Sequence, residues 1–118
     1  MTSLEEMKIY QALVDLLYYT YNITLKYPKI EKDGIVMDIK FNSIKALEEL
    51  IIAQKMYEVK QRLYHLDIVD SELKVIKVLI RISYKMKYIT SKNYSAWSKK
   101  ITSVNNLLNG WIKKCVKQ

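Results

Sequence analysis

Apolar residues recur along this chain at steps of three and four, the period of a helix with one buried face. No stretch shows a convincing period of two, so no strand is predicted. The first helical segment follows Ser3 and Glu6, a capping-box pair, and ends before Pro28, because the residue before a proline avoids the helical conformation. The apolar stripe of this helix consists of Met7, Tyr10, Leu13, Val14, Leu17, Tyr21 and Leu25.

A second helix is predicted behind a polar loop over residues 29–34. It runs from about Asp38 to about His65, and its apolar stripe includes Ile44, Leu47 and Ile51. Opposite charges at neighbouring helical positions line its polar face, as is typical of a solvent-exposed helix surface.

The third predicted helix begins at a cap formed by Asp67 or Asp70, and Glu72 in its first turn suits the N-terminal dipole. It is apolar over most of its circumference, so we expect it to be deeply packed. Its two apolar rows are Leu73, Ile76 and Ile80, and Val75, Leu79, Ile82 and Met86.

The fourth predicted helix has the strictest pattern. Thr90 or Ser91 caps its start, and one seam alternates at three and four residues over three heptads. The seam consists of Tyr94, Trp97, Ile101, Val104, Leu108, Trp111 and Cys115. This spacing is typical of near-parallel helix packing, so the sequence predicts an all-α, up-down four-helix bundle that fills residues 1–118 as a single domain.

The composition agrees with one compact domain of 118 residues. The first six residues are polar and acidic, unlike a signal peptide, and charged residues interrupt every apolar run before it could span a membrane. Cys115 is the single cysteine, so a disulfide framework within the chain is excluded. We therefore expect a cytoplasmic protein with no membrane segment.

Charge is strongly segregated along the chain. Residues 1–59 carry 7 basic and 9 acidic side chains, whereas residues 60–118 carry 13 basic and 3 acidic ones. No carboxylate side chain follows Glu72. A half of this kind favours a polyanion or an acidic protein surface as its neighbour, rather than a merely solubilising role.

The candidate binding residues lie on the third and fourth predicted helices. Four of them step by three, four and four residues along one stripe of the third helix, and the others lie off the seam of the fourth. The set consists of Lys74, Lys77, Arg81, Lys85, Lys92, Lys99, Lys100, Lys113 and Lys114. Lys outnumbers Arg 18 to 2 in the chain, which argues against many bidentate contacts to base edges and favours salt-sensitive phosphate contacts.

Catalytic chemistry has little support in the sequence. His65 is the only histidine and is expected near the end of the second helix, while Cys115 falls on an apolar seam where a small buried hydrophobe is the better interpretation. Gly34 and Gly110 are isolated, so no glycine-rich phosphate loop exists. We expect no enzymatic activity, no metal site and no cofactor.

Ten tyrosines raise the alternative of base stacking. Five of them cluster in the first helix and its exit, but this helix is poor in Lys, so core and interface packing is the better interpretation. Too many aromatic and aliphatic residues lie outside one inner face for a small bundle that stays alone. This excess indicates self-association.

Three segments of the second half resemble the accessory variability determinant (Avd) proteins of diversity-generating retroelements. They are residues 73–83 (LKVIKVLIRIS), 88–94 (YITSKNY) and 107–114 (LLNGWIKK), and the resemblance extends over about residues 47–114. It implies a four-helix bundle that assembles into a basic, barrel-like homopentamer. It also implies a bacterial or phage-encoded protein that partners the retroelement reverse transcriptase and the template-repeat RNA, with DNA as a further ligand. In this family the protein supports mutagenic cDNA synthesis and is not itself the polymerase.

Carried over by residue, the resemblance matches Lys74, Lys77 and Arg81 to basic positions of the third helix. Gly110 and Trp111 match a terminal motif in which a small residue beside an indole would allow close helix approach. Two alternatives remain open. One is a four-helix bundle protein of the ribosomal RNA intervening-sequence type, and the other is a protein-interaction or antitoxin-like bundle whose basic face meets an acidic protein.

Overall fold

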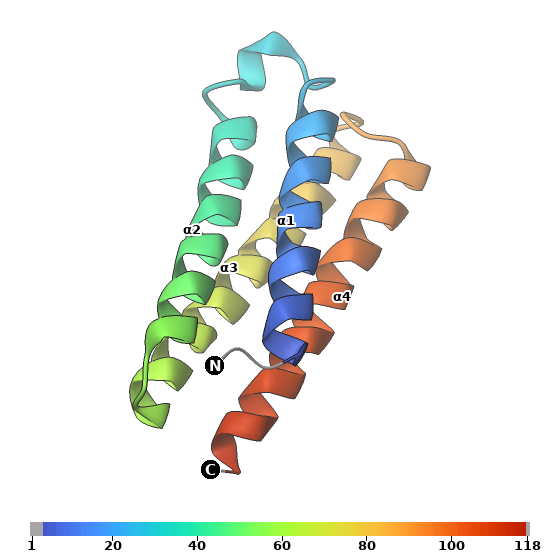
Figure 1. Cartoon of the computed structure of the whole chain (residues 1–118). Coiled ribbons are helices and arrows are strands. Elements are labelled where there is room, and N and C mark those ends of the chain that lie inside the picture. Colours follow the sequence, from blue (N-terminus) through green and yellow to red (C-terminus); the bar gives the residue numbers. More distant parts are fainter. Residues whose placement is uncertain (1–3, 118) are drawn as a thin grey trace.

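Four antiparallel helices form an up-down bundle, as predicted (Figure 1). The computed structural model describes residues 4–117, with side chains from Lys8 onward. The helices are α1 (Leu4–Thr24), α2 (Ile35–Lys55), α3 (Val59–Lys85) and α4 (Ser91–Val116), and a short 3-10 helix, η1 (Lys29–Glu31), lies between α1 and α2. In the described part of the chain, α1 and α3 each contact both α2 and α4 but not one another. The predicted capping box at Ser3 and Glu6 lies outside the residues whose side chains are described.

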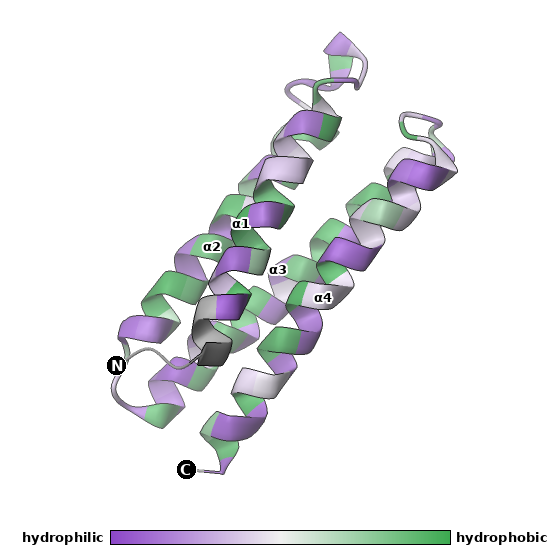
Figure 2. Ribbon diagram, turned by 45° about the vertical axis from the view of Figure 1, so that its right-hand side comes forward, coloured by the Kyte–Doolittle hydropathy of each residue, from purple (hydrophilic) through white to green (hydrophobic). Residues whose placement is uncertain are grey.

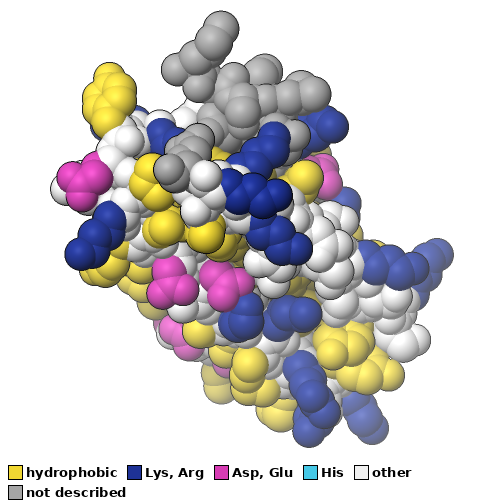
Figure 3. All heavy atoms as spheres, turned by 90° about the horizontal axis from the view of Figure 1, so that it is seen from below, with side chains coloured by type: hydrophobic (Ala, Val, Ile, Leu, Met, Phe, Trp, Pro, Cys, Tyr) yellow, Lys and Arg dark blue, Asp and Glu magenta, His cyan; other side chains and the backbone are white. Residues whose placement is uncertain are grey.

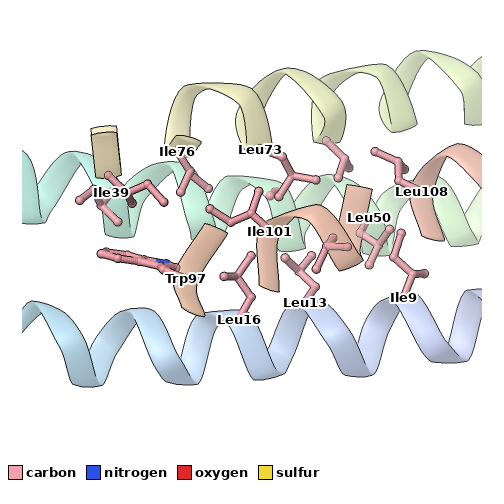
Figure 4. Close-up of a cluster of buried hydrophobic side chains, with 14 of the residues drawn as sticks. Ile9, Leu13, Leu16, Ile39, Leu50, Leu73, Ile76, Trp97, Ile101 and Leu108 are labelled. Carbon is pink, nitrogen blue, oxygen red and sulfur yellow. The ribbon is translucent and has the colours of Figure 1, made fainter. Parts of the chain in front are cut away.

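The core runs along the bundle axis and receives side chains from all four helices. Figure 4 shows Leu16 of α1, Ile39 of α2, Ile76 of α3 and Trp97 of α4 pointing toward one another. The predicted seam of α4 is confirmed: Tyr94 is half-buried and the other six positions are buried. Figure 2 shows the resulting alternation of hydrophobic and hydrophilic bands along α4. No helix in residues 4–117 combines the length and apolar run needed to cross a bilayer.

The predicted second helix is in fact divided between two helices. α2 ends at Lys55, Met56 and Glu58 adopt extended conformations with ψ of 132° and 127°, and α3 begins at Val59. Arg62 stabilises this turn because its Nε donates to the Ala53 carbonyl (3.1 Å) and its Nη2 donates to the Met56 carbonyl (2.6 Å). The guanidinium therefore caps the C-terminus of α2 by donating hydrogen bonds to carbonyls there. No glycine or proline in the sequence signals the end of this helix.

This boundary corrects three further expectations. Asp67 and Asp70 are not caps, and Glu72 is not in a first turn, because all three lie inside α3. His65 likewise lies within α3 and not at the end of α2. The 27-residue α3 thus begins eight residues or more before either predicted cap.

The predicted apolar stripe of α1 is largely wrong. Tyr10, Val14, Tyr21 and Leu25 are between 41% and 79% exposed. Leu13 and Leu17 of the predicted stripe are buried, and Met7 lies outside the residues whose side chains are described. The other core positions of α1 are Ile9, Leu16, Thr20, Ile23 and Thr24. Thr20 was passed over because it is polar, yet it is fully buried: it donates to the Leu16 carbonyl (2.7 Å) and accepts from the Trp97 indole (3.1 Å). A satisfied hydroxyl can occupy a core position at little cost.

Helices α2 and α3 also differ from their predicted faces. In α2, Ile51 is 40% exposed and Ile44 and Leu47 are half-buried, while Ala46 and Ala53 are fully buried beside Ile39 and Leu50. Small residues at the contact let helices approach closely. In α3 the row Leu73, Ile76 and Ile80 is buried as predicted, but Val75, Ile82 and Met86 are 42–54% exposed. The expectation that α3 is deeply packed on most sides is therefore wrong.

The α3–α4 turn is built by local hydrogen bonds. Lys87 has a positive φ of 64°, and Tyr88 N donates to the Ser83 carbonyl (3.0 Å), which is a helix C-cap of the Schellman type. Thr90 Oγ1 accepts from Asn93 N (3.1 Å), so the predicted cap of α4 is confirmed.

The same turn is tied to η1 by two tyrosines. Tyr88 donates to Glu31 Oε2 (2.5 Å), and this hydrogen bond raises the pKa of Tyr88. The Tyr27 ring packs against Tyr88 at 5.4 Å, and burial raises the pKa of Tyr27 to about 12. Both rings therefore remain neutral phenols near pH 7.

Candidate nucleic-acid interface

The predicted basic residues lie on the outer sides of α3 and α4. Eight of them are exposed, namely Lys74, Lys77, Arg81, Lys85, Lys92, Lys99, Lys113 and Lys114, and Lys100 is half-buried. Seen along the bundle from the end that carries the α2–α3 turn, Lys and Arg side chains reach the surface interspersed with hydrophobic ones (Figure 3). The cations are thus accessible to a large ligand.

Lys74 and Lys100 have carboxylate partners among the described residues. Lys74 Nζ lies 2.7 Å from Asp70 Oδ1 one turn earlier on α3, in an exposed i,i+4 pair. Lys100 Nζ lies 2.9 Å from Asp15 Oδ2 of α1 and 5.4 Å from the centre of the Tyr19 ring. Lys100 therefore faces α1, and it does not join the surface between α3 and α4.

Six other cations have no ion-pair partner among the described residues. No described carboxylate lies within 4.0 Å of Lys77, Arg81, Lys85, Lys92, Lys99 or Lys113. Their charges are left for solvent or for a ligand. A surface of this kind produces a positive potential that attracts polyanions over a Debye length of about 8–10 Å at physiological salt.

An open groove between α3 and α4 brings two predicted residues together. Lys77 of α3 and Lys99 of α4 both line it, together with Tyr94, Ser95, Ser98, Thr102 and Ser103. Four Ser and Thr residues thus accompany two lysines in one depression. We call it the α3–α4 groove.

The hydroxyl residues of this groove were missed by sequence reasoning, which followed charge alone. A usable signal was present, because Ser95, Ser98 and Thr102 step by three and four residues beside the α4 lysines. The Tyr84–Tyr94 contact was also missed. Their rings stack at 4.8 Å with an interplanar angle of 3°, and Tyr84 is 40% exposed.

The single histidine contacts a carboxylate of a neighbouring helix. His65 Nδ1 lies 3.2 Å from Glu49 Oε2, so this α3 side chain satisfies a carboxylate of α2 that is only 6% exposed. Glu72 lies near the same contact, and burial raises its pKa while Lys45 opposes the shift. This polar contact between α2 and α3 accounts for His65 without catalysis.

Cys115 is buried on the α4 seam, as predicted. Within residues 4–117, no group of three His, Cys, Asp or Glu side chains is arranged to hold a metal ion.

Of the two residues of the terminal motif, Trp111 has a structural role in the core and Gly110 lies on the surface. Trp111 is buried, at 3% exposure, and the Arg62 guanidinium lies 5.9 Å from its ring centre, so the indole packs against the residue that closes the α2–α3 turn. Gly110 is exposed, and a Cβ atom there would meet nothing within 4 Å. Among the described residues, Gly110 therefore makes no close helix approach within the protomer.

Taken together, these features define a four-helix bundle with a basic, hydroxyl-lined surface on one side. The model of the bAvd-like family matches residues 7–115, and the chain belongs to that family. No curated protein matches the chain.

A solved structure supports the fold. The chain is similar to the 1.70 Å crystal structure of a protein of unknown function from the S23 ribosomal protein family of Bacteroides thetaiotaomicron. The TM-score is 0.85 over 93% of this chain and 99% of that one, with 14% sequence identity. At that identity, the likeness concerns the arrangement of the helices.

Proposed function

We propose that this chain is a non-catalytic, cytoplasmic accessory protein of a diversity-generating retroelement. Through the basic surface of α3 and α4 it binds the reverse transcriptase and the template-repeat RNA, and it supports mutagenic cDNA synthesis without a cofactor of its own. The observation that carries the proposal is the set of exposed cations without described carboxylate partners, which includes Lys77, Arg81 and Lys99. Membership of the bAvd-like family supports the retroelement context.

Phosphate is the ligand that this surface suits best. Ammonium groups act as point charges toward phosphates, and the hydroxyls beside Lys77 and Lys99 can donate hydrogen bonds to phosphate oxygens. Contacts of this kind give affinity with little sequence preference. The sequence of the template would then be selected by base pairing or by the polymerase, and not by this protein.

The proposal includes assembly into a homo-oligomer, with a pentamer as the expected state. Two separate sets of exposed apolar residues support it: Tyr10, Val14, Tyr18, Tyr21, Leu25, Met37 and Phe41 on α1 and α2, and Val75, Val78, Ile82 and Met86 on α3. We call these the α1–α2 apolar surface and the α3 apolar surface. A closed ring requires two different, complementary patches on each protomer, and α1 and α3 are diagonal in the bundle.

Charge reversal tests the binding proposal. The variant Lys77→Glu/Arg81→Glu should lose template RNA and reverse transcriptase in a co-purification assay while its helicity and thermal melting stay close to those of the parent. The control is Lys26→Glu/Lys55→Glu, which makes the same charge change at exposed positions outside α3 and α4. Equal loss in both variants would indicate a non-specific charge effect and would contradict the proposed surface.

Salt dependence separates the possible partners. If the surface neutralises phosphates of single-stranded RNA, the logarithm of the binding constant falls with the logarithm of salt concentration by about 0.7 per contact. Binding of RNA that is unchanged between low and moderate salt would contradict the phosphate role. Retention of an acidic protein at high salt without RNA would instead support the protein-interaction alternative.

A further inference from the structure

The α3–α4 groove has the chemical make-up of a backbone-binding site for an extended anion. Lys77 and Lys99 reach it from two different helices, so charges flank it on both sides. Ser95, Ser98 and Thr102 follow one another along α4, spaced by about one helical turn or 5.4 Å. An extended strand likewise presents its phosphates as a repeating row along its backbone. The groove therefore offers a row of donors and not a single anion pocket.

An aromatic surface adjoins the groove. Tyr94 lines it, and Tyr84 stacks on Tyr94 in a nearly parallel arrangement, at 3°. Tyr84 is 40% exposed, and Tyr94 is its only ring partner in the described part of the chain. A parallel stack already held by the fold can be extended by one more flat ring at little entropic cost.

We propose that the α3–α4 groove binds unpaired nucleic acid, with phosphates along Lys77, Lys99 and the α4 hydroxyls and with one base stacked on the outer face of Tyr84. This inference rests on the proposed function, because it assigns a ligand class to part of the same basic surface. It goes further because it states that the groove prefers a single strand to a duplex. The aromatic contact, and not charge alone, determines this preference.

The preference follows from what each form of nucleic acid can present. In a duplex the bases are stacked on one another, so phosphates can reach Lys77 and Lys99 but no base can reach Tyr84. An unpaired strand offers both groups at once. Stacking accepts any base because every base has a π face, which agrees with a protein that carries 18 Lys and 2 Arg and so offers few bidentate base contacts.

The test is equilibrium binding by fluorescence anisotropy with one labelled RNA in two forms. The probe is a mixed-sequence strand of about 12 nucleotides without self-complementarity, within the usual range of single-strand site sizes, used alone and annealed to its complement. The full chain is titrated at about 50 mM salt, where phosphate contacts are strong. The parent protein is expected to bind the single strand more tightly than the duplex.

Two matched pairs of variants separate the contribution of the Tyr84 ring to RNA binding from that of the α3–α4 groove. Tyr84→Ala should weaken single-strand binding by about fivefold or more while duplex binding is unchanged, and Tyr84→Phe should retain the parent affinity because the ring remains. Thr102→Glu places a carboxylate in the groove and should weaken both forms. Its control, Ser71→Glu, adds the same charge at an exposed α3 position outside the groove and should have a smaller effect.

The outcomes distinguish this inference from the function on which it rests. If Lys77→Glu/Lys99→Glu abolishes binding but Tyr84→Ala has no effect and the two RNA forms bind equally, the stacking site is refuted and the basic surface stands. If Lys77→Glu/Lys99→Glu binds RNA as well as Lys26→Glu/Lys55→Glu does, the proposed function fails together with the inference. Thermal melts of each variant confirm that binding is compared between folded proteins.

Discussion

The two sides of this bundle share one core but present opposite surfaces. The outer side of α1 and α2 carries Tyr18 and Phe41, which are 73% and 68% exposed, whereas the outer side of α3 and α4 carries lysines and a row of hydroxyls. Both sides contribute to the core, since each of the four helices has fully buried residues. The difference therefore lies on the outer surface and is not imposed by the packing of the core.

The α3 apolar surface connects these two properties. Val78 is 58% exposed and follows Lys77 directly along the helix, so an apolar contact and a cationic contact lie next to each other. If α3 packs on a neighbouring protomer, the lysines beside it are carried to the edge of that interface. A ring would then repeat the basic surface once per protomer, and a long RNA could contact several copies with increased avidity.

The largest expected loss of stability comes from removing the buried contact that joins α4 to α1. Trp97 of α4 is fully buried and donates to Thr20 of α1, so Trp97→Ala should lower the free energy of unfolding by about 3–5 kcal/mol. Denaturant unfolding followed by circular dichroism measures the loss. Trp97→Phe keeps most of the packing and should cost less. A loss below about 1 kcal/mol for Trp97→Ala would show that the two sides do not depend on this contact.

The difficulty of predicting each side from the sequence has a physical cause. The seam of α4 was predicted correctly because most of its other positions are Lys, Ser, Thr or Asn, so only one continuous apolar face could be buried. In α1 two faces are apolar, and the period cannot tell a core from an interface. The pattern selected Tyr10 and Val14, which are exposed, and passed over the buried Thr20, whose partner Trp97 lies 77 residues away.

The site was predictable as far as it depends on charge. The lysines of α3 and α4 were identified because they are off the apolar seam, and most of them are exposed. Sequence spacing could not reveal that Lys100 turns to Asp15, or that Tyr84 stacks on Tyr94, because both contacts join different helices. The α2–α3 break was hidden for the same reason, since Arg62 caps a helix other than its own.

The second prediction tests whether the α1–α2 apolar surface serves assembly. Phe41→Glu places a charge at a position that is 68% exposed, so it should leave the fold intact and dissociate the oligomer. Sedimentation velocity reports the mass. Tyr57→Glu is the matched control, because Tyr57 is fully exposed in the α2–α3 turn and outside both apolar surfaces. A parent protein that is strictly monomeric at micromolar concentration would contradict the assembly.

The same variant sharpens the comparison between the two sides. Phe41→Glu should bind a short single strand as the parent does, because the α3–α4 groove lies within one protomer. Its affinity for a long RNA should fall, because a monomer cannot make several contacts at once. Equal losses for short and long RNA would mean that the two sides are not independent and that assembly completes the binding site.

The smallest expected effect concerns the turn that joins α3 to α4. Lys87 holds a φ of 64°, a conformation that costs a residue with a side chain about 1–2 kcal/mol and costs glycine almost nothing. Glycine gains more entropy in the unfolded chain, so Lys87→Gly should stabilise the protein by only about 0.5–1 kcal/mol, measured as a higher denaturation midpoint.

The same change removes one exposed cation from the basic side. If Lys87 contacts phosphate, the salt dependence of RNA binding should become shallower by about 0.7. A more stable protein with an unchanged salt dependence would place Lys87 outside the interface, whereas a shallower dependence would mean that the strained position is occupied by lysine for its charge.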